Sequence, residues 1–258
     1  MEVQILGAHQ LELKGARLTS LLIDGTLLID AGGVSSALSL PEQKNIRAVL
    51  LTHHHFDHTR DLVTLAANAA YCWQGQLAVY ALPCTLDIVA NYLLDGKVYT
   101  NFLEYPSKEK PTVVLETIEP YDRKTIVDYS VLAVPMKHSV PTLGYQITSP
   151  DGKNLFYTSD TTVGISDCWR HISPQLLIAE VVGPNEYRDW LRKAGHMCAE
   201  LLKEELIQFR QLKGYSPRVI VIHIGNLFEQ KIKEEIAQIA RELEADISLG
   251  YEDMKITL

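Results

Sequence analysis

The sequence predicts an α/β (α+β) protein in which two β-sheets pack face to face with helices outside them. Short apolar runs separated by the turn signals Asp24-Gly25 and Asp151-Gly152 predict hairpins near the start and in the middle of the chain. In each half, strands come first and then alternate with helices. The chain has 258 residues, 47% of them hydrophobic, which is enough for a sizeable core. No linker divides it, so we expect one domain over residues 1–258.

The first half is predicted to open with a strand meander and to continue with alternating helices and strands. Leu62, Leu65 and Ala69 recur at helical spacing, which predicts a helix over 61–71. The expected strands are 3–6, 18–23, 27–29, 48–52 and 76–80, and a second helix is expected at 84–94. Residues 95–112, with glycine, prolines and many charges, are the most loop-like stretch. Their aromatic side chains make them a candidate substrate or dimer loop.

The second half is predicted to follow the same order. Four apolar runs come first, and an alternation of strands with helices follows. The expected strands are 112–118, 126–134, 144–149, 154–159, 176–181 and 219–224, and the expected helices are 198–212 and 230–243.

Charge and cysteine content exclude several classes of protein. Lys and Arg number 24 against 32 Asp and Glu, a net charge of −8, which argues against non-specific coating of nucleic acid or anionic membranes. The four cysteines are dispersed, with no Cys-x-x-Cys pair, as in a reducing compartment. Residues 61–87 are uncharged between their terminal aspartates, but polar residues and a proline interrupt them. We therefore expect a cytoplasmic protein without a membrane segment or a secretory signal.

A dense cluster of metal-ligating side chains follows the predicted strand 48–52. Four histidines and one aspartate lie within six residues, His53-His54-His55-Phe56-Asp57-His58. Alternate residues of an extended chain share a face, so His53 and His55 can point to one side. Imidazole and carboxylate groups are ligands of borderline divalent cations. Five donors exceed what one tetrahedral centre uses, so the cluster predicts a site for two ions.

Three further potential ligands each follow another predicted strand. His138 follows residues 131–134, Asp160 follows 155–158 and His223 follows 219–222. Strand ends are rigid positions from which a constellation of ligands can be assembled. This distribution argues against a solvated histidine run at the surface.

The ordered set His53-x-His55-x-Asp57-His58, His138, Asp160 and His223 resembles the metallo-β-lactamase superfamily over essentially the whole chain. The resemblance implies a four-layer αββα sandwich with a dinuclear metal site at one edge of the sheets. It implies that the first metal is held by His53, His55 and His138, the second by Asp57, His58 and His223, and that Asp160 bridges the two. His54 has no ligand counterpart. Zinc is the first expectation, with manganese or iron as alternatives.

Glu180 and His196 carry the resemblance to one branch of this superfamily. Glu180 comes at the end of the apolar run 176–179, and His196 stands just before the helix that begins near Cys198. This pair resembles that of the tRNA 3′-processing endonucleases and the class II cyclic-nucleotide phosphodiesterases. It implies that a metal-bridging hydroxide, oriented by Asp57, attacks phosphorus while His196, held charged by Glu180, protonates the leaving oxygen.

The order of motifs within this branch favours a small, anionic phosphodiester substrate such as a cyclic nucleotide. The residues around the final histidine, Ile222 to Asn226, and the segment after Glu180 look closer to the cyclic-nucleotide enzymes. No long arm rich in Lys and Arg is present to grip a tRNA, so nucleic acid is the disfavoured alternative. A lactone or thioester hydrolase is another alternative. A di-iron protein is disfavoured because that group usually has a glutamate at the position of His55. A homodimer is the default expectation.

Overall fold

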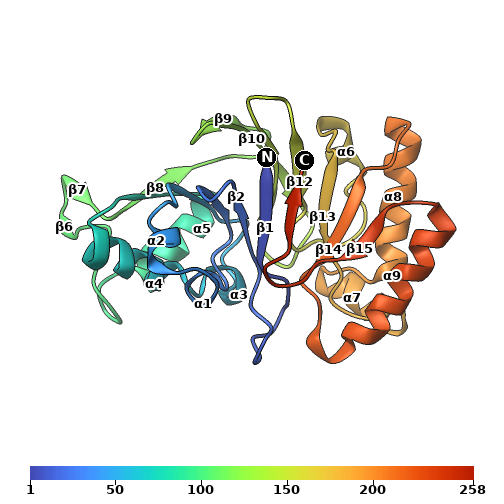
Figure 1. Ribbon diagram of the computed structural model, residues 1–258, viewed down its shortest axis with the longest axis horizontal. Helices are drawn as coiled ribbons and strands as arrows, with labels where there is room; N and C mark the ends of the chain where they lie inside the picture. Colours follow the sequence, from blue (N-terminus) through green and yellow to red (C-terminus); the bar gives the residue numbers. More distant parts are fainter.

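The structure, a computed structural model that describes residues 1–258, contains two seven-stranded β-sheets that lie between two layers of helices (Figure 1). The first sheet consists, in spatial order, of β16 (Lys255–Thr257), β1 (Glu2–Gly7), β2 (Ser20–Ile23), β3 (Leu27–Ile29), β4 (Ala48–Leu50), β5 (Leu77–Ala81) and β8 (Val113–Thr117). The second consists of β15 (Ile247–Leu249), β14 (Arg218–Ile222), β13 (Leu176–Glu180), β12 (Asn154–Tyr157), β11 (Thr142–Thr148), β10 (Tyr129–Met136) and β9 (Arg123–Ile126). The predicted αββα sandwich is therefore confirmed.

Each sheet has one antiparallel part and one parallel part. In the first sheet β16, β1, β2 and β3 pair antiparallel, whereas β3, β4, β5 and β8 pair parallel. In the second sheet β9 to β12 pair antiparallel and β12 to β15 pair parallel. Parallel strands need crossover connections, and most of the helices lie in these connections.

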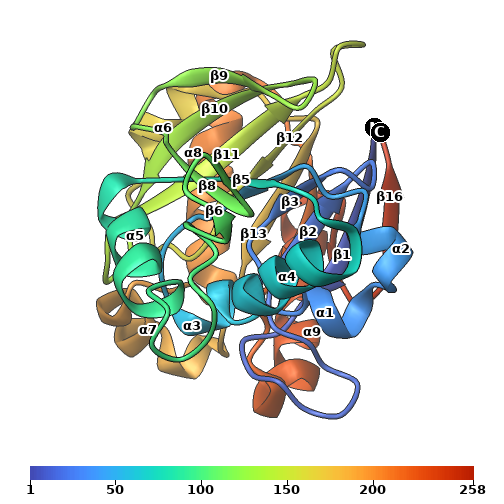
Figure 2. The same ribbon diagram turned by 90° about the vertical axis from the view of Figure 1, so that its left-hand side faces the viewer.

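The helices form two groups, one for each sheet. The first group is α1 (Val34–Ala37), α2 (Leu40–Gln43), α3 (Phe56–Thr59), α4 (Leu62–Asn68) and α5 (Pro83–Ile88), of which α4 and α5 continue into π-helical turns to Trp73 and Leu93. Figure 2 shows α4 and α5 on the outer side of the first sheet. The second group is α6 (Ser166–His171), α7 (Arg188–Ala194), α8 (Ala199–Lys213) and α9 (Glu229–Leu243). None of these helices combines the length and apolarity that crossing a bilayer requires.

Three hydrophobic clusters hold the four layers together. The central one lies between the sheets and contains 25 buried residues, among them Tyr145, Tyr157 and Leu21. The second cluster contains 27 residues and joins the second sheet to its helices, with Trp169 and Phe209 in contact. The third contains 23 residues and joins the first sheet to α1, α4 and α5. Both faces of each sheet are covered, which explains why the strands read as nearly continuous apolar runs.

The structure corrects the prediction of one strand over 126–134. Ile126 is instead the last residue of β9, and β10 begins at Tyr129; the two strands form an antiparallel hairpin. The turn between them puts Val127 in the left-handed region, at φ 58°. A β-branched residue rarely occupies that region, so the sequence carries no usual turn signal at this point.

The segment 95–112, a predicted loop, contains a short hairpin formed by β6 (Pro106–Ser107) and β7 (Lys110–Pro111). Phe102 is fully buried and its ring lies 5.7 Å from that of Tyr99 and 6.4 Å from that of Tyr105. Packing of the loop therefore accounts for Phe102. A role of this segment in binding substrate or a second subunit stays a prediction.

Candidate metal centre and acid pair

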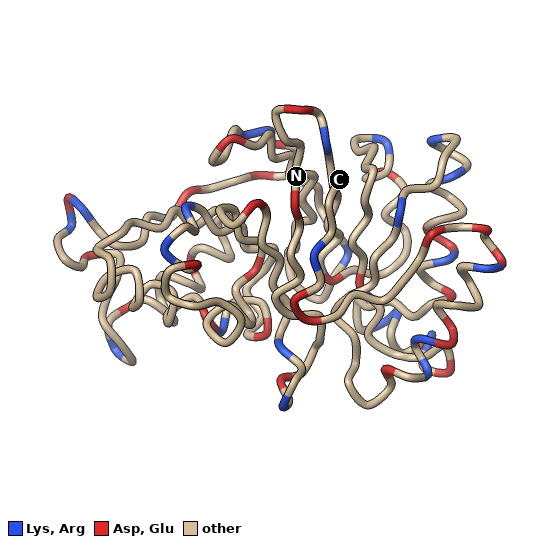
Figure 3. Tube along the Cα trace, in the orientation of Figure 1, with Lys and Arg blue, Asp and Glu red and all other residues tan.

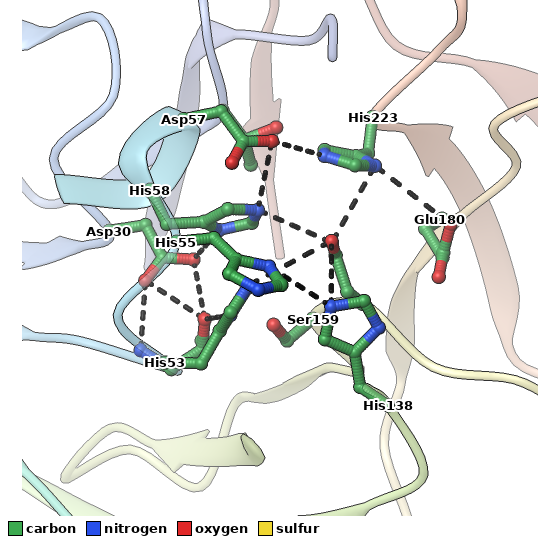
Figure 4. Close-up of polar contacts among 12 residues, drawn as sticks. Asp30, His53, His55, Asp57, His58, His138, Ser159, Glu180 and His223 are labelled. Atoms are coloured by element: carbon green, nitrogen blue, oxygen red, sulfur yellow. Dashed lines mark hydrogen bonds and ion pairs between the residues drawn. The ribbon is translucent and has the colours of Figure 1, made fainter. Parts of the chain in front are cut away.

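The histidine cluster lies where β4 ends and α3 begins. His53 and His54 continue the chain after the strand, and His55 is the extended residue just before α3, at φ −61° and ψ 149°. Asp57 and His58 then lie in the single turn of α3, closed by the bond from the His58 amide to the His55 carbonyl (3.1 Å). This is the extended segment followed by a turn that the spacing predicts. It directs several donors toward one point (Figure 4).

The second sheet brings the other predicted residues to the same place. His138 follows β10, Asp160 follows β12, and His223 follows β14 directly. Glu180 is the last residue of β13 and pairs with Ile222 of the parallel neighbour β14. The carboxyl ends of parallel strands meet at one edge of a sheet, which is the usual place of a ligand site in such sheets.

The structure gathers the seven predicted ligands into two sets that share one residue. His53, His55, His138 and Asp160 form the first set, and Asp57, His58, Asp160 and His223 form the second. Within each set the potential ligand atoms lie within 4.8 Å of one another. His54 is outside both sets.

The carboxylate of Asp160 faces both sets, one oxygen to each. Its Oδ2 lies 3.9 Å from His53 Nε2 and 3.8 Å from His138 Nε2. Its Oδ1 lies 3.3 Å from His58 Nε2 and 3.5 Å from His223 Nδ1. A carboxylate placed in this way can bridge two cations.

Unpartnered buried atoms show that this site suits cations. His53 Nε2, His58 Nε2, His223 Nδ1 and Asp160 Oδ1 are buried and have no hydrogen-bond partner. Burying an unpaired polar atom costs free energy, and native proteins rarely do so without a function or an ion. The four atoms converge, and all are imidazole nitrogens or carboxylate oxygens, which divalent cations such as zinc bind.

Hydrogen bonds hold the far sides of three of these imidazole rings, whose other nitrogens converge on the centre. His138 Nδ1 donates to the Gly195 carbonyl (3.0 Å) and His58 Nδ1 donates to Asp30 Oδ2 (2.7 Å). The Thr52 hydroxyl lies 3.0 Å from both carboxylate oxygens of Asp30 and 3.0 Å from His53 Nδ1. The Thr52 hydroxyl donates its single proton to the Asp30 carboxylate, so its oxygen accepts the Nδ1 proton of His53. Each of these rings would therefore present an unprotonated nitrogen to a bound cation.

Asp30 and Thr52 hydrogen-bond to residues of the candidate centre, and the sequence pattern did not single them out. Asp30 is fully buried, follows β3 and has φ 56°. It also accepts the Thr52 amide (2.8 Å), so its two oxygens support one ligand of each set. The signal in the sequence was an acidic residue at a strand end, Asp30-Ala31-Gly32. Gly32 is required there, because a Cβ would lie 2.1 Å from the Asp57 carbonyl oxygen.

In the ion-free chain, protons partly take the place of cations. Burial lowers the pKa of His223, but Asp160 and the hydrogen bond with Asp57 (3.0 Å) outweigh it and raise the pKa to about 10. Burial also lowers the pKa of His58, but the carboxylates of Asp160 and Asp30 outweigh this effect and raise the pKa well above its usual value. Burial raises the pKa of Asp57, but His223 and His58 outweigh it and bring the pKa to about 2.

Glu180 and His196 form a hydrogen-bonded pair beside the second set. His196 Nδ1 lies 3.1 Å from both oxygens of Glu180, which is fully buried. Glu180 Oε1 also accepts the Thr161 amide (2.6 Å). Burial lowers the pKa of His196, but the charge and hydrogen bond of Glu180 outweigh it, so this pKa is raised. His196 Nε2 makes no hydrogen bond within the chain.

A third group of donors, Glu180, His196 and His223, also lies within 4.8 Å. The carboxylate of Glu180 already accepts hydrogen bonds from His196 and from the Thr161 amide. We therefore interpret Glu180 and His196 as a pair that holds a proton beside His223, a residue of the second set. The ring of His196 stacks on that of His223 at 5.9 Å between centroids.

A four-layer sandwich with a histidine and aspartate centre where its sheets meet defines a metal-dependent hydrolase of the metallo-β-lactamase type. The chain belongs to this superfamily, because the family model "Beta-lactamase superfamily domain" matches residues 25–224. The family fold implies divalent metal ions. The sequence prediction of the superfamily and of a hydrolase is confirmed.

Named relatives fit the phosphodiesterase and tRNA-processing branch. The chain is 22% identical over 210 residues to a Yersinia pestis protein named "Probable 3',5'-cyclic-nucleotide phosphodiesterase", covering 73% of this chain and 60% of that one. It is 30% identical over 135 residues to Ribonuclease Z of Acaryochloris marina, covering 51% and 40%. It therefore spans only part of the length of these relatives. The solved structure of unliganded yeast PDE1 has the same fold, with TM-score 0.82, 16% identity and coverage of 100% of this chain and 99% of that one.

Proposed function

We propose that this protein is a metal-dependent phosphodiesterase that cleaves a small diester such as a cyclic nucleotide. The observation that carries the proposal is the pair of Glu180 and His196, joined at 3.1 Å, beside two complete sets of metal-ligating atoms. An alkoxide leaving group is strongly basic, so its departure needs a proton. Cleavage of a thioester expels a thiolate, which is a much weaker base, and so has less need of such an acid.

Two divalent ions, with zinc as our proposal, would be held by the two sets that share Asp160. His53, His55 and His138 would complete the first set, and Asp57, His58 and His223 the second. When bound, such ions act as Lewis acids toward a phosphoryl oxygen and lower the pKa of water. Asp57 is 26% exposed, so it is also placed to orient a water molecule at the open side.

His196 would donate the proton to the leaving oxygen. Its Nδ1–H is held by Glu180, which fixes the orientation of the ring and favours the protonated form. The second proton then lies on Nε2, which has no partner in the chain and is free to reach the substrate. The side chain is 14% exposed, so a ligand at the centre can contact it.

The distribution of charge favours a small diester over a tRNA. Figure 3 shows Lys and Arg interspersed with Asp and Glu along the chain. In the segment 95–112 Lys97 is paired with Asp95 and Lys108 with Glu104. A protein that holds a polyanion uses several unpaired cations. We further propose that residues 1–258 form one domain, that the protein acts in the cytoplasm, and that a homodimer is its default assembly.

The test combines metal analysis with a substrate panel. The purified protein should contain two divalent ions per chain and should cleave bis(p-nitrophenyl) phosphate and a cyclic nucleotide in preference to p-nitrophenyl esters, lactones and a pre-tRNA. His55→Ala should lose metal and activity together, whereas His196→Ala should keep its metal. Rapid ester or lactone cleavage without diester cleavage would contradict the proposal. Three ions per chain, with loss of one in His196→Ala, would make His196 a ligand instead of an acid.

A further inference from the structure

A pocket that the proposed chemistry does not use adjoins His196. It has a volume of about 260 Å³, and His196 forms part of its wall. Three aromatic residues, Tyr187, Trp190 and Phe228, form other parts of the wall. The imidazole of His196 therefore borders both the candidate metal centre and this aromatic pocket.

The aromatic pocket is built from segments that are far apart in the sequence. Gln10 comes from the loop between β1 and β2, Trp190 from α7, and Phe228 from the turn before α9. The amide of Leu11 donates to Asn226 Oδ1 (3.1 Å), which fastens the first loop to the last. Gly225 lets the chain pass close to Val182, which also lines the pocket, because a Cβ at position 225 would lie 2.1 Å from the carbonyl oxygen of Val182.

Large apolar side chains around the aromatic pocket are exposed to solvent. Trp190 is 65% exposed, Tyr187 is 44% exposed and Leu227 is 83% exposed. The Tyr187 and Phe228 rings pack together with 5.5 Å between centroids. Apolar surface gathered beside a reactive group, with a few polar side chains among it, is typical of a ligand site.

No residue of the pocket wall carries a fixed charge. None of the 13 lining residues is Lys, Arg, Asp or Glu. The two arginines of α7 are occupied elsewhere, since Arg188 and Arg192 both pair with Glu204 of α8. Apart from His196, whose proton the proposed chemistry uses at the leaving oxygen, the wall has no cationic group to neutralise a second phosphate, and an uncharged group suits the pocket best.

We propose that the aromatic pocket binds a flat, uncharged ring, a nucleobase or an aryl group, carried by the leaving side of the diester. The inference rests on the proposed function, because His196 would face the leaving oxygen and the pocket begins at His196. Tyr187 and Trp190 supply the faces on which a ring can stack, and stacking tolerates any flat ring. The amides of Gln10 and Asn226 are the polar groups available to the edge of a heterocycle.

Two cyclic diesters that differ in the ring test this proposal. One is 3′,5′-cyclic AMP, and the other is the cyclic phosphate of 1,3-propanediol, which has the same six-membered diester but neither sugar nor base. The measured quantity is the ratio of their kcat/KM values for the metal-loaded protein. Intrinsic reactivity is the same for every variant, so a change in this ratio reports the binding of the remainder of the substrate.

The ratio should fall in Trp190→Ala and in Tyr187→Ala by about 5- to 140-fold for each stacking ring that the substitution removes. Tyr92→Ala is the matched control, because Tyr92 is 68% exposed and does not line the pocket. Its ratio should equal that of the wild type. Adenosine should also inhibit competitively, and its inhibition constant should rise by the same factor in the two pocket variants.

An unchanged ratio in both pocket variants, with both diesters still cleaved, would overturn the pocket assignment and leave the proposed function intact. Equal kcat/KM values of the wild-type protein for the two diesters would also overturn the pocket assignment and leave the proposed function intact. Failure of the metal-loaded wild type to cleave either diester would overturn the proposed function and, with it, the assignment of the ring to a leaving group.

Discussion

Replacing His196 with alanine should slow the cleavage of a diester with an alkoxide leaving group by about 10²–10⁴-fold, which is the usual contribution of a positioned general acid. The structure supports a value in the upper part of this range. The ring is held at 3.1 Å by a fully buried carboxylate, and the pKa of His196 is raised, so the acid form persists at neutral pH.

The identity of the leaving group separates this role from a structural one. p-Nitrophenolate is a weak base and departs without a proton, so His196→Ala should slow cleavage of bis(p-nitrophenyl) phosphate by less than about tenfold. Cleavage of 3′,5′-cyclic AMP should show the full loss. Metal content should equal that of the wild type, because His196 lies outside the two main ligand sets.

The pH profile gives a second measurement. Glu180→Gln removes the charge that raises the pKa of His196, so this pKa should fall. The alkaline limb of kcat for cyclic AMP should then move to lower pH, while the limb for the p-nitrophenyl diester stays in place. Equal losses for both substrates in His196→Ala, or an alkaline limb that does not move in Glu180→Gln, would refute the assignment of His196 as the acid.

Three further predictions concern the support of the metal centre. Asp30→Asn should weaken metal binding by about 10- to 100-fold in chelator competition, because Asp30 orients one ligand of each set; wild-type affinity would show that it does not. Gly195→Ala should lower both Tm and metal content, because Gly195 has φ 85° and a Cβ there would lie 3.0 Å from His138 Nδ1; an unchanged melting curve would contradict this. Metal binding at pH 7 should release protons, because the pKa of His223 is raised to about 10 in the ion-free chain. Calorimetry in buffers of different ionisation enthalpy measures this release, and affinity should increase with pH below 10.

The sequence predicted most of the fold, and it singled out the residues that converge at the candidate metal centre, because both depend on local patterns. Buried strands read as apolar runs, and the ligands follow such runs at their ends, as His223 follows β14. Helices α6 and α7 were not predicted, since each is short and is held by tertiary contacts. Trp169 of α6, for example, donates to the buried Glu205 of α8 (2.8 Å).

The supporting residues and the aromatic pocket required the three-dimensional structure. Asp30 supports His58 across 28 positions of sequence, and no local pattern connects them. Gln10 and Phe228 share a pocket although they lie near opposite ends of the chain. Such contacts depend on which strands become neighbours, and the apolar pattern alone does not determine that order.

The two ligand sets also connect the two halves of the molecule mechanically. His53 and His58 follow a strand of the first sheet, whereas His138 and His223 follow strands of the second. Bound ions would therefore cross-link the two sheets. An ion present at a thousand times its Kd stabilises the folded state by about 4 kcal/mol, and two such ions would supply much of a typical domain's 5–15 kcal/mol. Without bound ions the chain would unfold more often, and proteases would cleave the unfolded form. The amount of this protein in a cell, and not only its activity, should therefore follow the supply of metal.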